Sequence, residues 1–103
     1  MARPRKCRMV DAEPDVTYFK PRGIPLIELK EVELTVEEFE AIRLNDLGEK
    51  EQKEVGKKMG VSQPTLHRLL VSARKKISDA IVNGKAIKIH GGTYSIIGKS
   101  RKR

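Results

Sequence analysis

A break of three residues between two helical patterns constrains the fold of this chain more than any other feature. The pattern before the break covers about residues 49–59, and the pattern after it covers residues 63–83. Gly60 is suited to the left-handed backbone that ends a helix, and Ser62 is a favoured N-cap for the helix that follows. Val61 lies between them and can fill the angle between the helices. This spacing predicts a helix-turn-helix unit.

The helix after the break has one apolar face. Apolar residues recur along it at steps of three and four, which is typical of a helix with one buried side. They are Leu66, Leu69, Leu70, Ala73, Ile77, Ala80 and Ile81. The opposite face is polar and basic, and we therefore expect it to be exposed to a ligand.

An earlier helix is predicted to begin at Thr35 and to end at Gly48. Thr35 and Glu38 have the spacing of a capping box, in which each side chain accepts a hydrogen bond from the other residue's backbone N–H. The many glutamates suit the positive end of the helix dipole. Capping and solubility therefore explain the acidic cluster better than acid–base chemistry or metal binding does. The cluster comprises Glu31, Glu33, Glu37, Glu38 and Glu40.

Short strands are expected on both sides of the helices. Residues 16–19 are β-branched and aromatic and lie between prolines, which is typical of a short edge strand. Residues 86–90 and 93–97 alternate with a period of two around Gly91-Gly92, and this pattern predicts a β-hairpin. An isolated hairpin is only marginally stable. It would have to pack on the helices, pair with the N-terminal strand, or pair with another chain.

The sequence as a whole predicts a mainly α fold: a three-helix helix-turn-helix with an extended N-terminal arm and a short C-terminal β-hairpin. Four segments are expected. They are a basic, proline-rich arm at 1–33, a DNA-binding domain at 34–84, the hairpin at 85–98 and a basic tail at 99–103.

The positive charge is concentrated at the two ends of the chain. The formal net charge is +8, but residues 11–50 alone sum to −6. Residues 1–10 sum to +4, and residues 62–103 sum to +9 with Asp79 as their only acid. Such asymmetry indicates that the C-terminal half faces a polyanion.

Several classes of protein are excluded or disfavoured. A single cysteine, Cys7, rules out an intrachain disulfide framework. Cys7, His67 and His90 lack the closely spaced pair that zinc sites need, so no metal is expected. No nucleophile–base pair or phosphate-binding loop is present, so we expect neither an enzyme nor a cofactor. No apolar run approaches the length of a membrane span, and a cytoplasmic protein is expected.

Candidate contact residues follow from the position of the second helix of the unit. Its N-terminal residues would project into the major groove, where Gln can pair with adenine and Arg with guanine. The expected base contacts are Gln63, Pro64, Thr65, His67 and Arg68. The expected phosphate contacts are Ser62, Ser72, Arg74, Lys75 and Lys76. The basic arm can add minor-groove or phosphate contacts from Arg3, Arg5, Lys6 and Arg8.

The chain resembles two known families. Residues 34–44, 59–66 and 72–77 are similar to the helix-turn-helix of sigma-factor region 4, from its first helix to its basic trailing helix. With Arg3-Pro4-Arg5 and residues 18–26 included, the chain resembles a family of small uncharacterised archaeal and bacterial proteins described as predicted DNA-binding. That resemblance implies a DNA-binding role. Gly56 departs from the sigma-like pattern, because a glycine inside a helix costs about 0.5–1 kcal/mol relative to alanine.

The favoured interpretation is a transcription regulator that binds double-stranded DNA. One reading helix gives little specificity, so we expect a homodimer on half-sites about 34–36 Å apart. Two alternatives stay open. One is a basic RNA- or ribosome-associated protein, and the other is a protein-interaction module that binds, for example, RNA polymerase.

Overall fold

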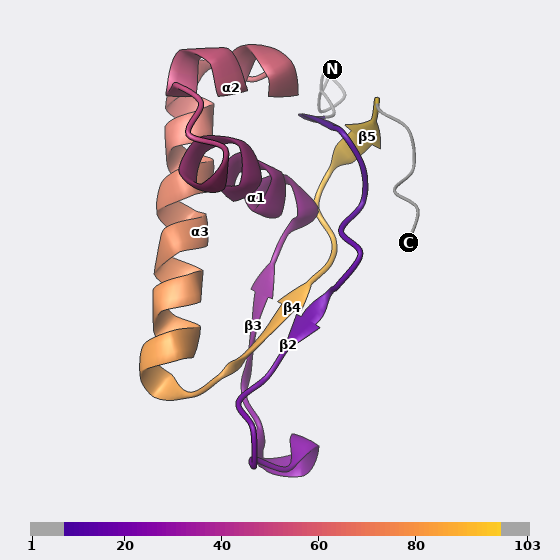
Figure 1. Ribbon diagram of the computed structural model, residues 1–103, viewed down its shortest axis with the longest axis vertical. Coiled ribbons are helices and arrows are strands. Elements are labelled where there is room, and N and C mark those ends of the chain that lie inside the picture. Colours follow the sequence, from indigo (N-terminus) through magenta and orange to yellow (C-terminus); the bar gives the residue numbers. More distant parts are fainter. Residues whose placement is uncertain (1–7, 98–103) are drawn as a thin grey trace, which may run out of the picture.

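The longest element, helix α3 (Gln63–Asn83), runs along one side of the molecule, and two further helices and the larger of two sheets pack against it (Figure 1). In this computed structural model, which describes residues 8–97, α1 and α2 lie beside the N-terminal half of α3. Two small sheets complete the fold, and about half of the described chain is helical. The protein is therefore a compact arrangement of three helices and short strands.

Capping residues set most ends of the helices as the sequence predicts. Helix α1 (Val36–Ala41) begins at the capping box of Thr35 and Glu38, in which both reciprocal hydrogen bonds are present. It continues as one π-helical segment, η2 (Ile42–Leu47), which ends at Gly48. Helix α2 (Gln52–Met59) begins three residues after the start predicted near residue 49, because Glu49 has a left-handed φ of 58° that no helix contains, and it ends at Gly60, whose φ of 69° is also left-handed. The Ser62 hydroxyl then accepts a hydrogen bond from the Thr65 backbone N–H and caps α3.

The strands form one three-stranded and one two-stranded sheet. The first has the order β2-β4-β3, with β4 antiparallel to β2 and parallel to β3, and the second joins β1 and β5 in parallel. The bounds are β1 Arg8–Val10, β2 Tyr18–Phe19, β3 Glu31–Leu34, β4 Ala86–Ile89 and β5 Tyr94–Ile96, with a 3-10 turn, η1, at Leu26–Glu28. The edge strand expected at 16–19 is confirmed in part, because only Tyr18–Phe19 form β2 at the edge of the larger sheet.

The predicted C-terminal β-hairpin is wrong. Both of its strands exist, but β4 pairs with β2 and β3, whereas β5 pairs with β1. The intervening glycines are held at the start of α1, because the Gly91 carbonyl accepts a hydrogen bond from the Val36 N–H. The Thr93 N–H in turn donates to the Glu37 carboxylate at 2.7 Å. These contacts direct the chain past the helix instead of back along β4.

The N-terminal segment is built into both sheets. The sequence assigns residues 1–33 to an extended arm, but residues 8–34 supply β1, β2 and β3. Strand β3, which the sequence analysis does not anticipate, pairs along its whole length with β4. Residues 1–7 of the predicted arm lie outside the described residues.

Two apolar clusters hold α3 in place. Fully buried side chains of α2, α3 and the α1–η2 helix form the first, and Leu34, Ala73 and Ile89 form the second between α3 and the larger sheet. The first comprises Ala41, Leu44, Val55, Met59, Leu66 and Leu70. Gly56 is also buried, and a Cβ there would lie 3.1 Å from the Val61 carbonyl oxygen. The missing side chain thus lets the α2–α3 connection pass close to α2.

A glycine substitution at the α2–α3 connection should test this packing. A Cβ on Gly60 would stand 2.8 Å from the Met9 Cε, whereas one on Gly84 would meet nothing within 4 Å. Both glycines are left-handed, so each Gly→Ala change should cost about 1–2 kcal/mol in backbone strain. Gly60→Ala should lose more than Gly84→Ala in urea unfolding, because Met9 must also move. Equal losses would mean that Met9 is not held against the turn.

Candidate nucleic-acid interface

The N-terminal part of α3 presents an exposed group of side chains beside the start of α2. Four of the five predicted base-contact residues, Gln63, Pro64, His67 and Arg68, are exposed. Together with Gln52 of α2 they line a shallow open hollow. Hydrogen-bonding side chains therefore share one surface with a proline, and no part of the core covers them.

Gln52 also belongs to this surface, although it is not among the contact residues predicted from the sequence. It precedes Val55 by three residues and Met59 by seven, and both of these are buried against α3. Gln52 therefore lies on the face of α2 that turns toward α3. That spacing is the signal in the sequence that would have found it.

Thr65 and Ser62 are in the cap of α3 and not in the hollow. The Ser62 hydroxyl donates to Thr65 Oγ1 at 2.9 Å and accepts from the Thr65 backbone N–H at 3.3 Å. The Arg68 guanidinium lies 3.4 Å from the same Thr65 Oγ1. These contacts orient the first turn of α3, and through it the side chains that line the hollow.

Besides Ser62 in the cap of α3, three more of the five predicted phosphate contacts are engaged within the protein. Arg74 makes a two-pronged ion pair with Asp46 at 2.8 and 3.1 Å, and this pair raises the pKa of the arginine. Ser72 donates to Glu38, and Lys76 pairs with the same carboxylate at 2.7 Å. Their first role in the fold is to connect α3 with α1 and η2.

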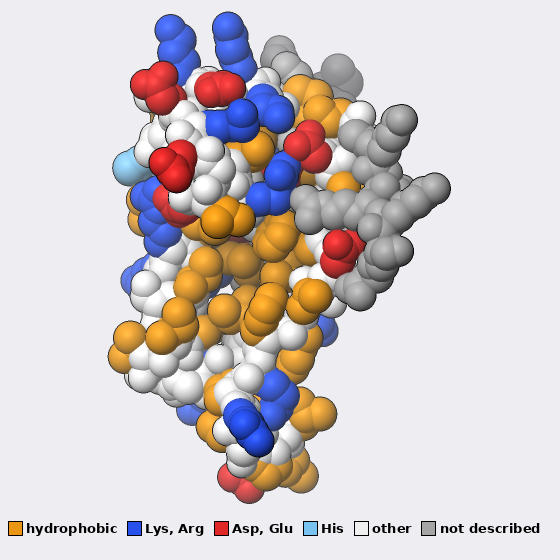
Figure 2. Space-filling view, viewed as in Figure 1, with side chains coloured by type: hydrophobic (Ala, Val, Ile, Leu, Met, Phe, Trp, Pro, Cys, Tyr) orange, Lys and Arg blue, Asp and Glu red, His pale blue; other side chains and the backbone are white. Residues whose placement is uncertain are grey.

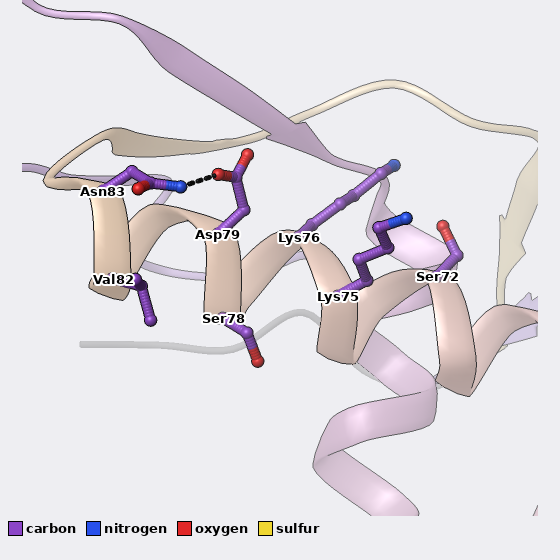
Figure 3. Close-up of a pocket in the computed structure, with 7 residues that line it drawn as sticks. All are labelled: Ser72, Lys75, Lys76, Ser78, Asp79, Val82 and Asn83. Carbon is purple, nitrogen blue, oxygen red and sulfur yellow. Dashed lines mark hydrogen bonds between the residues drawn. The ribbon is translucent and has the colours of Figure 1, made fainter.

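Lys75 differs from these three residues. It is exposed on the solvent side of α3, and no ion pair within residues 8–97 involves it. It lines a shallow groove with Ser72, Lys76 and Ser78, and Figure 3 shows Lys75 and Lys76 projecting from neighbouring positions of the helix. Lys75 is thus the predicted phosphate-contact lysine that remains available to an external anion.

The predicted arm contacts divide into two groups. Arg3, Arg5 and Lys6 lie outside the described residues, as does Cys7. Arg8 begins β1 and pairs with the buried carboxylate of Glu37 at 2.9 Å. The next residue, Met9, packs beside Gly60, so the start of the described chain adjoins the α2–α3 connection.

The acidic residues of α1 are interior anchors. Glu37, Glu38 and Glu40 are each at most 4% exposed, so solubility does not explain them. Glu40 accepts from the Asp11 N–H and from Arg43, and Glu37 holds Arg8 and the Thr93 N–H. One short helix therefore fastens both strands of the β1–β5 sheet and α3.

Acid should weaken the protein partly through Glu38. Burial raises the pKa of its carboxyl, but hydrogen bonds from Lys76, Ser72 and Thr35 lower it further, and the net pKa lies below the ordinary value of 4.5. A lowered folded-state pKa contributes stability above the unfolded pKa, and that stability is lost as the pH falls through the folded value. Urea midpoints measured between neutral pH and about pH 3 should fall less steeply for Glu38→Gln than for the wild type. Parallel pH profiles would contradict this role.

Metal binding and membrane insertion find no support in residues 8–97. This part of the chain contains no cluster of three or more His, Cys, Asp or Glu side chains suited to a metal ion. His90 pairs with Glu33 at 2.8 Å, and His67 lies in the hollow beside Arg68. Over the same range, no helix has both the length and the hydropathy needed to span a bilayer.

Comparisons with known proteins identify the family of the chain. The model of the family described as "Protein of unknown function DUF134" matches residues 1–97. A UPF0251 protein of Caldanaerobacter subterraneus subsp. tengcongensis is 58% identical over 102 residues, which are 99% of this chain and 86% of that protein. A UPF0251 protein of Moorella thermoacetica is 56% identical over 98 residues, which are 95% of this chain and 66% of that protein. No solved structure matches the chain. The chain therefore belongs to the DUF134 family of bacterial proteins of unknown function, to which the UPF0251 proteins correspond.

Proposed function

We propose that this protein binds double-stranded DNA and regulates transcription, with the N-terminal part of α3 in the major groove. The observation that carries the proposal is the exposed group Gln63, His67 and Arg68, with Pro64, at the start of a helix whose other face is buried. Such a helix fits the major groove, and Gln and Arg are the side chains that pair bidentately with adenine and guanine there.

The arrangement of α2 and α3 supports this docking mode. The two helices are joined through Gly60, Val61 and Ser62, as in a helix-turn-helix unit. In that unit the first helix crosses the DNA backbone while the second reads bases. Gln52, at the first turn of α2, would then be close to a phosphate or to the side chains that read bases.

The proposed phosphate contacts are fewer than the charge of +9 on residues 62–103 indicates. Lys75 is exposed and projects from α3, so we assign it to a phosphate. Arg74, Lys76 and Ser72 are held by Asp46 and Glu38, and we assign them to the fold first. Contacts from Arg3, Arg5 and Lys6 stay a prediction from charge alone.

The alternative functions have weaker support. A protein-interaction module would use the acidic residues around α1, but the Glu37, Glu38 and Glu40 carboxylates are turned inward. An RNA-binding protein would read unpaired bases with stacked aromatic rings. The hydroxyls of Tyr18 and Tyr94 instead donate to Glu31 and Glu13. Duplex DNA is the ligand that fits the exposed side chains best.

Binding measured against salt separates DNA from RNA. Affinity for random-sequence duplex DNA should fall steeply with salt, because bound counterions are released from neutralised phosphates. The same titration with a structured RNA of equal length should give weaker binding at every salt concentration. Stronger binding to the RNA would overturn the proposal.

A further inference from the structure

A second hollow, which is apolar, lies at the C-terminal end of α3. It is at the opposite end of the helix from the proposed base contacts Gln63, Pro64, His67 and Arg68, which we call the reading surface. It opens between the last turns of α3 and strands β2 and β4, and its walls are mainly hydrophobic. Its lining residues include Phe19, Pro21, Ala80, Ile81 and Ile87. Phe19 is 52% exposed and Ile81 is 73% exposed. Figure 2 shows hydrophobic side chains gathered across the region between α3 and the sheet.

The hollow exists because α3 covers only part of the sheet. Leu34 and Ile89 are paired across β3 and β4 and are buried against Ala73 of α3. The next row on the same face contains Val32, Ile87 and Phe19, which are paired in register across all three strands. None of these three is fully buried. A cluster of apolar side chains that the fold leaves partly uncovered in this way is typical of an interaction site.

We infer that this hollow is the interface with a second copy of the chain. The surface combines a concave part with a projecting side chain, because Ile81 lines its α3 wall while remaining mostly exposed. A two-fold axis beside Ile81 would place this side chain of each copy in the hollow of the other, as an isologous interface requires.

The charges around the hollow also suit a second copy. Its lining carries Lys20 and Lys85, the latter paired with Asp79, and the neighbouring surface carries Glu28 and Lys30. A two-fold axis can bring Lys20 of one copy to Glu28 of the other, and the symmetry then forms the same ion pair a second time. The surroundings of the hollow therefore carry both signs of charge, which a second copy can match.

The hollow also lies at a distance from the N-terminus of α3 that suits a dimer bound to two DNA half-sites. This part of the inference rests on the proposed function. Ile81 follows Leu66 by fifteen residues, so it lies about 22 Å along α3 from the reading surface. Half-sites one DNA turn apart place each reading helix about 17 Å from the dimer axis. An axis near Ile81 can therefore hold both helices at the required separation when α3 is inclined to the DNA.

Sedimentation velocity in the absence of DNA tests the inference. We expect the wild type to sediment as a dimer, and Ile81→Glu to weaken dimerisation by at least about a hundredfold. Val82→Glu is the matched control, since Val82 is 78% exposed on the next position of α3 and does not line the hollow. Figure 3 shows Val82 pointing to the other side of the helix from Asp79 and Asn83. Far-UV circular dichroism should show both variants folded, because both side chains are mostly exposed.

Three results would overturn the inference. They are a monomeric wild type at millimolar concentration, a dimer that survives Ile81→Glu, and loss of the dimer in Val82→Glu. Because no DNA is present, the result is independent of the proposed function. A dimer that is lost in Ile81→Glu, in a protein that does not bind duplex DNA, would uphold this interface and remove the DNA-binding proposal.

Discussion

Glu40→Ala is expected to reduce the free energy of unfolding by about 2–4 kcal/mol. Glu40 is 1% exposed and accepts three hydrogen bonds, from the Asp11 N–H at 2.8 Å and from Arg43 at 2.8 and 2.9 Å. Its removal leaves a backbone donor and part of a guanidinium unsatisfied. Arg43 is about a quarter exposed and retains Asp11, so the loss should be near the lower end of that seen for buried ion pairs.

Chemical denaturation of Glu40→Ala in urea measures this loss, with Glu54→Ala as the matched control. Glu54 also forms an ion pair, with Lys50 at 3.5 Å, but both side chains are well exposed. Its removal should change the unfolding free energy by no more than about 0.5 kcal/mol. Glu40→Gln keeps the size and one acceptor oxygen and should be intermediate. If Glu40→Ala is as stable as Glu54→Ala, the buried contact does not contribute to folding.

Arg68→Ala is expected to lower the affinity for the best DNA sequence by about 10- to 100-fold, corresponding to about 1–3 kcal/mol for one bidentate base contact. The loss should be confined to sites with the preferred base at one position, so that specificity there is relaxed. The physical reason is that Arg68 lies in the hollow with Gln63 and His67 and is free to contact a base. Its hydrogen bond to Thr65 Oγ1 is long, at 3.4 Å.

Lys75→Ala is the matched comparison, because it removes one exposed positive charge from the same helix. This change should weaken binding to all duplexes alike and reduce the salt slope by about one. Fluorescence anisotropy with the preferred duplex and with single-base variants separates the two patterns. Equal effects of the two substitutions on every sequence would remove the distinction between base and phosphate contacts.

Local signals in the sequence predicted the ends of the helices, except for the start of α2, which lies at Gln52 and not near residue 49. Gly48, Gly60 and Gly84 follow helix ends, and Thr35 and Ser62 cap helix starts, because capping depends on residues within one turn of each other. The same short range explains why the exposure of Gln63 and Arg68 at the start of α3 could be anticipated from the position of the turn.

Strand pairing could not be predicted in the same way. The alternation in residues 86–97 correctly indicates two strands, but their partners lie far away in the sequence, at β1, β2 and β3. The choice depends on the Val36 and Thr93 N–H groups, which fix the glycine link at α1. Such contacts form only once α1 and the strands β1 and β5 have come together.

The ion pairs of the candidate site could not be predicted from the sequence either, because they too join distant residues. A basic face on α3 is evident from the sequence, but the pairing of Arg74 with Asp46 and of Lys76 with Glu38 joins residues 28 and 38 positions apart. Net charge therefore overstates the number of cations available to DNA. The burial of Glu37, Glu38 and Glu40 likewise depends on partners from β1 and α3.

Selection from a random pool of duplex DNA tests the central claim most directly. The protein is incubated with the pool at physiological salt, and bound duplexes are recovered and sequenced over several rounds. The account predicts one enriched sequence, with two-fold symmetry and half-sites about one helical turn apart, bound at least about a thousandfold more tightly than the random pool. A pool that remains random after selection, with binding governed by salt alone, would contradict it.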